Sequence, residues 1–141
     1  ELLSANDMSL VEATAARTVD VGAAARSLVG KVDVIYTNTD NNVVSAFEAL
    51  VKVGNDAKIP IIASDTDSVA RGAIAALGVN YYDLGLQTGK MVVRILKGEK
   101  PGDIASETSD RLELFVNPAA AKKQGVTLDE AFVKSATKII E

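Results

Sequence analysis

Short apolar runs alternate along this chain with longer stretches of helical spacing. The runs have the length of a strand, and several of them are rich in Val, Ile or Tyr. In the longer stretches apolar residues recur every three or four positions, as they do on one face of a helix. The runs predict strands at 8–13, 32–36, 59–63, 79–82 and 111–116. The longer stretches predict helices at 18–30, 43–54, 69–77, 84–97, 118–124 and 128–140.

This alternation is typical of βαβ units, in which a helix crosses between neighbouring parallel strands. Because such crossovers are right-handed, successive units build one sheet with helices packed on it. The sequence therefore predicts an α/β fold, a three-layer sandwich with a parallel sheet. The chain has 141 residues, which suits one domain or one lobe of a larger protein. We expect residues 1–141 to form a single α/β lobe.

The first seven residues, ELLSAND, have the character of the end of a helix. We therefore expect the chain to begin inside a longer protein, so that the missing signal segment says nothing about secretion.

Composition narrows the chemistry. The formal net charge is −4, so the chain lacks the basic excess with which proteins neutralise nucleic-acid phosphates or bind anionic lipids. It contains neither Cys nor His, which excludes catalysis by either residue, including the Ser-His-Asp triad, and removes the usual ligands of structural zinc. From composition we therefore expect no nucleic-acid partner, no structural zinc site and no catalysis by Cys or His.

Two polar turns follow two of the predicted strands, TNTDNN at 37–42 and SDTDS at 64–68. Ligands of parallel sheets bind beyond the carboxyl ends of the strands. Each turn also leads into a predicted helix, and these residue types are ordinary helix N-caps. Two such turns carry more polar side chains than two caps need, however. The sequence therefore predicts a ligand site that contains Thr39, Asp40, Asn41, Asp65, Thr66 and Asp67.

A third candidate group is the pair Tyr81 and Tyr82, at the end of the predicted strand 79–82. Adjacent strand residues face opposite sides of a sheet, so one ring can enter the core while the other faces a cleft. A tyrosine at a cleft can stack on a ligand and form a hydrogen bond through its hydroxyl. The alternative, that both rings simply pack, is equally consistent with the sequence.

An enzymatic alternative rests on Asp65-Thr66-Asp67. Two aspartates in this spacing after an apolar strand resemble the nucleophile motif of haloacid-dehalogenase-type phosphatases, which hold Mg²⁺ between carboxylates. Such a site also needs a suitably placed Lys and a second acidic pair. Asp83, Asp103 and Asp110 are scattered along the chain and do not form an obvious pair.

Several blocks of sequence, in order, resemble the substrate-binding proteins of ABC transporters, and above all the tryptophan/tyrosine-type group. The blocks are TDNNVVSAFEA, IPIIASDTDSVARGAIAALG, NYYDLGLQTGKM, ILKGEKPGDI and LFVNPAAAKKQGVTL. The resemblance covers residues 10–128. It implies a type I periplasmic-binding-protein fold, in which two α/β lobes joined by three crossing strands close on a ligand.

By this resemblance the chain is the C-terminal half of such a protein and its lobe has a flavodoxin-like topology. The lobe would lack its first strand and most of its first helix. Segment 79–110 would cross the hinge and pack on the N-terminal lobe, which is absent from this chain. The residues that match the family's ligand-facing turns are the three groups named above.

The resemblance implies a solute-binding function and not an enzymatic one, with no metal and no cofactor. It implies an amino acid as the ligand, aromatic amino acids included, and an ABC transporter permease as the partner. It implies a periplasmic or membrane-anchored extracellular location. Without the N-terminal lobe, helix 84–97 would expose an apolar face, which we expect to be covered by that lobe or by pairing or swapping with a second copy. A ligand-sensor domain of a transcription regulator shares the fold and remains an alternative, as does an excised fragment without activity of its own.

Overall fold

A computed structural model describes residues 3–141 and contains one five-stranded sheet. Its strands lie side by side in the order of the sequence. The first three are mutually parallel, the fourth is antiparallel to the third, and the fifth is parallel to the fourth. The strands are β1 (Ile35–Thr37), β2 (Ile61–Ala63), β3 (Ala75–Val79), β4 (Leu112–Val116) and β5 (Lys138–Ile139).

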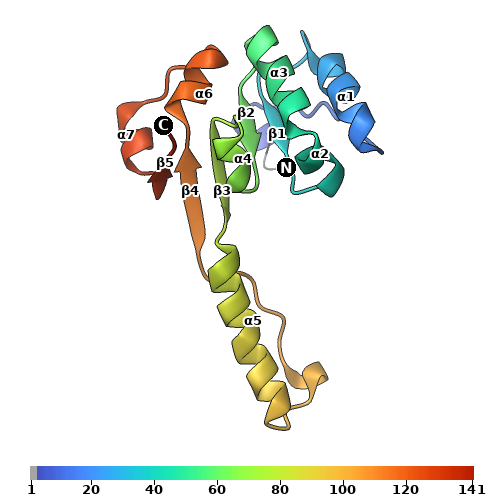
Figure 1. The fold of residues 1–141 in the computed structure, drawn as a ribbon, viewed down its shortest axis with the longest axis vertical. Coiled ribbons are helices and arrows are strands. Elements are labelled where there is room, and N and C mark those ends of the chain that lie inside the picture. Colours follow the sequence, from blue (N-terminus) through green and yellow to red (C-terminus); the bar gives the residue numbers. More distant parts are fainter. Residues whose placement is uncertain (1–2) are drawn as a thin grey trace.

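Seven α-helices and three short 3-10 helices accompany the sheet in the described part of the chain (Figure 1). The α-helices are α1 (Val21–Leu28), α2 (Asn41–Ser45), α3 (Phe47–Ala57), α4 (Asp67–Ala70), α5 (Tyr81–Leu96), α6 (Pro118–Lys123) and α7 (Glu130–Lys134). The 3-10 helices are Ser4–Asn6, Thr18–Asp20 and Pro101–Asp103.

The helices pack on both faces of the sheet around two separate cores. On one face α1, α3 and α4 bury apolar side chains against Ile35, Ile61 and Ala76. On the other face α6 and α7 pack with Ile62 and Ala75. Neighbouring residues of one strand thus serve opposite cores, as the pleat of a strand requires. The predicted three-layer α/β sandwich is confirmed, with the difference that β4 runs against β3.

Helix α5 stands apart from these layers. Residues 80–111, here called the α5 arm, consist of α5 and the segment that returns from it to β4 (Figure 1). The arm projects from the end of the sheet, and none of the residues of α5 is buried. It leaves several large apolar side chains exposed: Tyr81, Tyr82, Leu86, Val92, Val93, Ile95 and Leu96.

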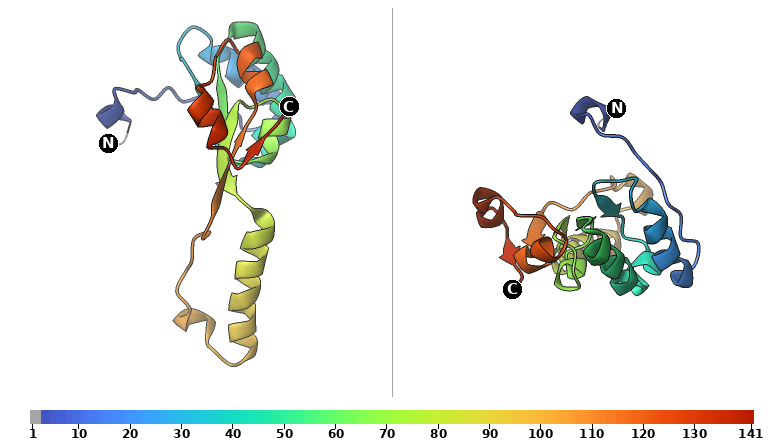
Figure 2. Two further views of the ribbon diagram at one scale, coloured as in Figure 1. Left: turned by 90° about the vertical axis from the view of Figure 1, so that its left-hand side faces the viewer. Right: turned by 90° about the horizontal axis from the view of Figure 1, so that it is seen from above.

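The predicted strand at 8–13 is wrong. These residues are extended but form no strand within residues 3–141, and they lead away from the sheet (Figure 2). Leu10 is 67% exposed. Alternation of apolar residues indicates a strand only where a partner supplies the ladder, and β1, the nearest edge of the sheet, pairs only with β2 in this structure. The expected helix end at 1–7 is a 3-10 turn at Ser4–Asn6, closed by Asp7 in the left-handed conformation, and residues 1–2 lie outside the described residues.

The predicted helix at 69–77 and strand at 79–82 are also wrong, because the strand comes earlier. Helix α4 ends at Ala70, Gly72 turns the chain with a φ of 121°, and β3 follows at Ala75–Val79. The alanines here resemble a helix. In a central strand covered on both faces, however, a continuous run of small apolar residues is expected instead of alternation. Tyr81 and Tyr82 consequently begin α5 and do not end a strand.

The predicted helix at 128–140 is correct only over Glu130–Lys134, because the chain then turns into β5. The amide of Thr137 donates to the carbonyl oxygen of Leu114 over 2.7 Å, which begins the pairing with β4. The predicted helix at 43–54 is two helices, which meet at Ala46. The other predicted elements are shifted by a few residues at their ends.

One buried side chain joins three elements. Gln124 follows α6 and is fully buried; its Oε1 accepts from the amide of Ile61 over 2.8 Å, and its Nε2 donates to the carbonyl oxygen of Gly72 over 2.8 Å. The start of β2 and the turn after α4 therefore depend on this amide for their hydrogen bonds.

Replacing Gln124 by Leu should lower the free energy of unfolding by about 2–4 kcal/mol, because it leaves a buried N–H and a buried C=O without partners. Urea denaturation followed by circular dichroism measures the change, and an unaltered slope would show that the denatured state is unaffected. The exposed neighbour Lys123→Ala is the control and should change the stability by less than about 0.5 kcal/mol. Equal stabilities of wild type and Gln124→Leu would contradict the role of this amide.

An ion pair joins α3 to the turn after α4. The guanidinium of Arg71 donates to both carboxylate oxygens of Glu48, over 2.7 and 2.8 Å, and lies 5.5 Å from the centre of the Phe47 ring. The hydrogen bonds from Arg71 lower the pKa of Glu48 from 4.5 to about 2.

Because this pKa is depressed in the folded state, the pair stabilises the fold above pH 4.5 and loses its effect as the pH falls towards 2. The difference in stability between wild type and Glu48→Gln should therefore shrink across this range, as measured by urea denaturation at a series of pH values. Both side chains reach solvent, so 1 M salt should reduce the difference as well. A difference that stays constant down to pH 2 would exclude the ion pair as its source.

Candidate functional site

The candidate site lies at the edge of the sheet where β1, β2 and β3 end. The three strands are parallel, so their carboxyl ends meet at one edge, and the α5 arm projects from the same edge (Figure 1). The two polar turns and the two tyrosines follow these strand ends. The structure thus brings the three predicted groups to one side of the lobe.

The first turn begins α2 through a carboxylate cap. The Oδ1 of Asp40 accepts from the amides of Asn42 and Val43, over 2.9 and 3.1 Å, which satisfies two of the free N–H groups at the start of α2. Thr39 and Asn41 flank this cap, and both are exposed. One residue of the predicted set is thus committed to the fold, while its two neighbours face solvent.

The second turn has the same division of roles. Asp65 is buried and accepts twice from Ser68, with Oδ1 from the amide over 2.9 Å and Oδ2 from the hydroxyl over 2.8 Å. Thr66 is buried too, whereas Asp67, the first residue of α4, is exposed. Within residues 3–141 the carboxylate of Asp67 has no hydrogen bond or ion pair. Asp67 is therefore the carboxylate of this turn that can receive a cationic group.

A hydrogen bond and a close backbone approach connect the groups. The hydroxyl of Thr39 lies 2.9 Å from the hydroxyl of Ser64, which joins the first turn to the second. Gly78 of β3 lies so close to the second turn that a Cβ on it would approach the carbonyl oxygen of Ser64 to 3.0 Å. The absence of a side chain at position 78 thus allows the second turn to pack on the strand that leads to the tyrosines.

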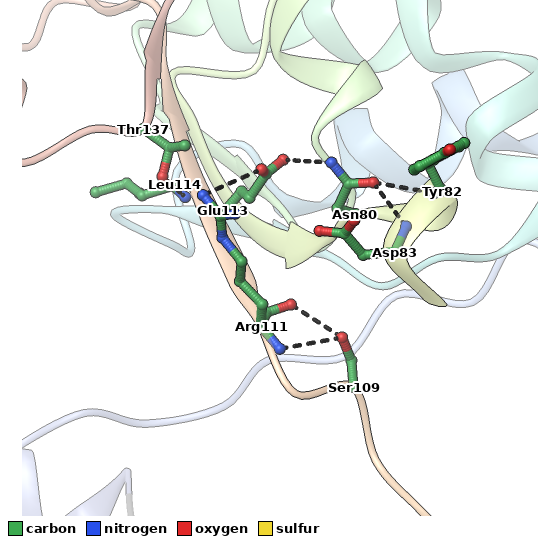
Figure 3. A network of polar contacts seen from close by, with 8 residues as sticks. All are labelled: Asn80, Tyr82, Asp83, Ser109, Arg111, Glu113, Leu114 and Thr137. Carbon is green, nitrogen blue, oxygen red and sulfur yellow. Dashed lines mark hydrogen bonds and ion pairs between the residues drawn. The ribbon is translucent and has the colours of Figure 1, made fainter. Parts of the chain in front are cut away.

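Both tyrosines lie in the first turn of α5. Asn80 caps this helix: its Oδ1 accepts from the amides of Tyr82 and Asp83, over 3.0 and 3.1 Å (Figure 3). Tyr81 is 56% and Tyr82 75% exposed. Neither ring is therefore packed in a core of the described residues.

Sequence reasoning missed two of the residues that build this edge. Ser64 was not among the predicted site residues, although its hydroxyl joins the two turns. Asn80 was read as part of a strand because hydrophobic and aromatic residues surround it. The spacing N-Y-Y-D at 80–83 places an N-cap residue three positions before an acidic one, which is a signal of a helix start and would have corrected the reading.

The edge is open and is not a closed pocket. A cavity of about 250 Å³ lies between α3 and α6, away from the candidate residues. A larger hollow runs between the N-terminal segment and β1 and reaches only Thr37 and Asn38 at the start of the first turn. Small-molecule sites are normally concave, so a ligand bound at this edge would need a second wall opposite it.

The phosphatase alternative gains no support from this geometry. Across residues 3–141, no three carboxylates come together as a metal site of that kind requires. Asp65 is also engaged by Ser68 on both of its oxygens.

None of the helices within residues 3–141 is long and apolar enough to span a bilayer.

Comparison with known proteins places these features in a family. The family model for ABC transporter substrate binding protein matches residues 1–140. A tyrosine-binding protein of Clostridioides difficile (strain R20291) is 41% identical over 117 residues, which are 83% of this chain and 34% of that protein.

Solved structures of an ABC domain and of a substrate-binding protein also resemble this chain. The ABC domain of a Streptococcus pneumoniae protein in complex with L-Trp superposes with a TM-score of 0.87 at 29% identity, over 97% of this chain and 46% of that one. The ligand-free, open structure of a substrate-binding protein with adhesive properties from Clostridium difficile superposes with a TM-score of 0.72 at 35% identity, over 99% and 46%. The chain spans less than half of each of these relatives. The match over nearly its whole length means that it belongs to the family of ABC transporter substrate-binding proteins.

Proposed function

We propose that this chain supplies one lobe of a two-lobe protein that binds a small solute and delivers it to the permease of an ABC transporter. The observation that carries the proposal is the open edge of the sheet, where exposed polar and aromatic side chains gather beside the α5 arm. The family match over residues 1–140 supports it, as does the share of about 46% that the chain covers in the solved relatives. The other lobe would form the opposite wall of the cleft.

The α5 arm fits a role in joining the lobes. Its exposed apolar side chains, among them Leu86, Val93 and Leu96, need a cover that residues 3–141 do not provide. The second lobe would cover them, so segment 79–110 would cross the hinge and pack on that lobe. Ligand contacts from both lobes would favour the closed state over the open one, and the permease would recognise the closed state.

The chemistry of the edge suits an amino acid with an aromatic side chain. Asp67 offers an exposed carboxylate to an ammonium group, Thr39 and Asn41 offer hydrogen-bonding groups, and Tyr81 and Tyr82 offer rings. Asp40, Asp65 and Thr66 would shape the turns. The relatives described as tyrosine-binding and as a complex with L-Trp support this ligand class. A protein of this function works outside the cytoplasmic membrane, in the periplasm or anchored at the cell surface.

Binding alone accounts for these features, without a chemical step. Residues 1–141 contain no His and no Cys, and no three carboxylates gather into a metal site in the described structure. The protein would thus act as a carrier and not as an enzyme.

The two-lobe protein should be stabilised by L-tyrosine or L-tryptophan and not by L-aspartate or L-lysine. A ligand at about 100 times its Kd adds about 2.7 kcal/mol to the free energy of unfolding, which thermal unfolding detects readily. The 141-residue chain alone should show no shift at the same concentrations, because it supplies only one wall of the cleft. The absence of a shift in the two-lobe protein with every amino acid tested would refute the proposed ligand class.

The two aspartates of the second turn should respond differently to substitution. Asp67→Asn should raise the Kd for L-tyrosine about 10- to 100-fold, because it removes a charge-assisted contact, with little effect on stability. Asp65→Ala should instead lower the free energy of unfolding by about 1–2 kcal/mol, because it removes the carboxylate that closes the turn. Isothermal titration calorimetry and urea denaturation separate the two effects. A Kd that Asp67→Asn leaves unchanged would remove Asp67 from the site.

A further inference from the structure

The α5 arm meets the lobe where β3 leads into α5 and the returning segment leads into β4. The two strands are paired over five residues, and the last pair is Val79 with Leu112. In this register Gly78 lies opposite Glu113, and continuing it by one residue would place Asn80 opposite Arg111. Because side chains alternate across a strand, Asn80, Arg111 and Glu113 lie on one face of the ribbon.

The side chain of Asn80 connects both sides of this junction (Figure 3). Its Oδ1 accepts from the amides of Tyr82 and Asp83 in the first turn of α5. Its Nδ2 donates to Oε2 of Glu113 on β4 over 3.2 Å. One amide group thus fixes the start of α5 to the strand through which the chain returns to the lobe.

Glu113, the partner of Asn80 on β4, is itself held in place by its surroundings. Its side chain is only 13% exposed, and Nη2 of Arg111 lies 3.8 Å from its Oε1. A carboxylate so largely removed from water requires partners for its charge and its lone pairs. Asn80 and Arg111 are the partners that the described structure provides.

The rest of the α5 arm is held together by contacts of its own. Gln87 donates through Nε2 to Oε2 of Glu107 over 3.0 Å and to the carbonyl oxygen of Thr108 over 2.9 Å. Arg94 donates through Nε to Oε2 of Glu99 over 2.7 Å. The arm is therefore tied into one unit, which joins the lobe at the ends of β3 and β4, where Asn80 lies.

We propose that Asn80 is a positioning residue that, through its link to Glu113, sets the direction of the α5 arm relative to the lobe and thereby the position of Tyr81 and Tyr82 at the ligand edge. The part that concerns the ligand rests on the proposed function, whereas the part that concerns the arm does not. Asn80 acts through the first turn of α5 and does not itself contact the ligand.

The test uses the two-lobe protein with two spin labels. Residues 1–141 contain no Cys, so Ser45→Cys on α2 and Lys97→Cys at the end of α5 add exposed attachment sites on the lobe and on the arm. Any cysteine outside this range is replaced by serine. Pulsed electron paramagnetic resonance then gives the distribution of distances between the two labels in the absence of ligand. Isothermal titration calorimetry gives the Kd for L-tyrosine.

Three substitutions separate the link to Glu113 from the helix cap. Asn80→Ser retains an oxygen that can cap α5 but does not reach Glu113. It should broaden the distance distribution and raise the Kd about three- to tenfold, the effect of one lost hydrogen bond. Asn80→Asp retains the cap and places a second carboxylate beside Glu113, so it should broaden the distribution further. Asn80→Asp combined with Glu113→Gln exchanges donor and acceptor and should restore the wild-type distribution.

The matched control is Asp129→Ala, which removes an N-cap of the same kind from α7, where Asp129 accepts from the amides of Ala131 and Phe132. It should lower the melting temperature and leave the distances and the Kd unchanged. A distance distribution that Asn80→Ser leaves unaltered would overturn the proposal, as would a failure of the double substitution to restore it. If the wild type binds neither L-tyrosine nor L-tryptophan, the proposed function fails, and the ligand-free distances still decide the role of Asn80.

Discussion

The antiparallel pairing of β3 with β4 is the constraint on which the architecture depends. Up to β3 the strands run in one direction and their helices cover one face. Because β4 runs in the opposite direction, the right-handed crossover from β4 to β5 places α6 and α7 on the other face. One reversal of direction thus produces the third layer. To reverse its direction, the chain leaves the sheet after Val79 and returns at Leu112. This excursion is the α5 arm, which lies beside the ends of β1 and β2.

The candidate site follows from the same constraint together with local capping chemistry. Asp40, Asp65 and Asn80 all close turns at the starts of helices, and each follows a strand that ends at the same edge. Their side chains are occupied by backbone or hydroxyl donors, whereas Thr39, Asn41, Asp67 and both tyrosines face solvent. The residues that order the edge and the residues that can meet a ligand are therefore neighbours in sequence, which is why sequence alone does not separate them.

Much of the fold could be predicted from periodicity, and the failures have physical causes. Strands at Ile35 and Ile61 were recognisable because each lies in a short run rich in Val or Ile that ends at a polar turn. The strand at Ala75 was missed because a strand covered on both faces shows no alternation, and its small residues have high helix propensity. The segment at Met8 alternates as a strand does, yet a strand also needs a partner for its ladder. The end of the chain combines a short helix with β5, and their boundary at Thr137 depends on hydrogen bonds to Leu114 that no local pattern reveals.

Because α5 is long, a small change of angle at its base moves its far end by a large distance. A helix of 16 residues is about 24 Å long at 1.5 Å per residue. It acts as a lever, so a rotation of about 10° at Asn80 would displace its far end, near Leu96, by about 4 Å. Small rearrangements of a few polar atoms at the strand ends are thus amplified into movements as large as a side chain. The more narrowly the side-chain amide of Asn80 fixes the angle of α5, the more narrowly it fixes the position of the far end of the helix.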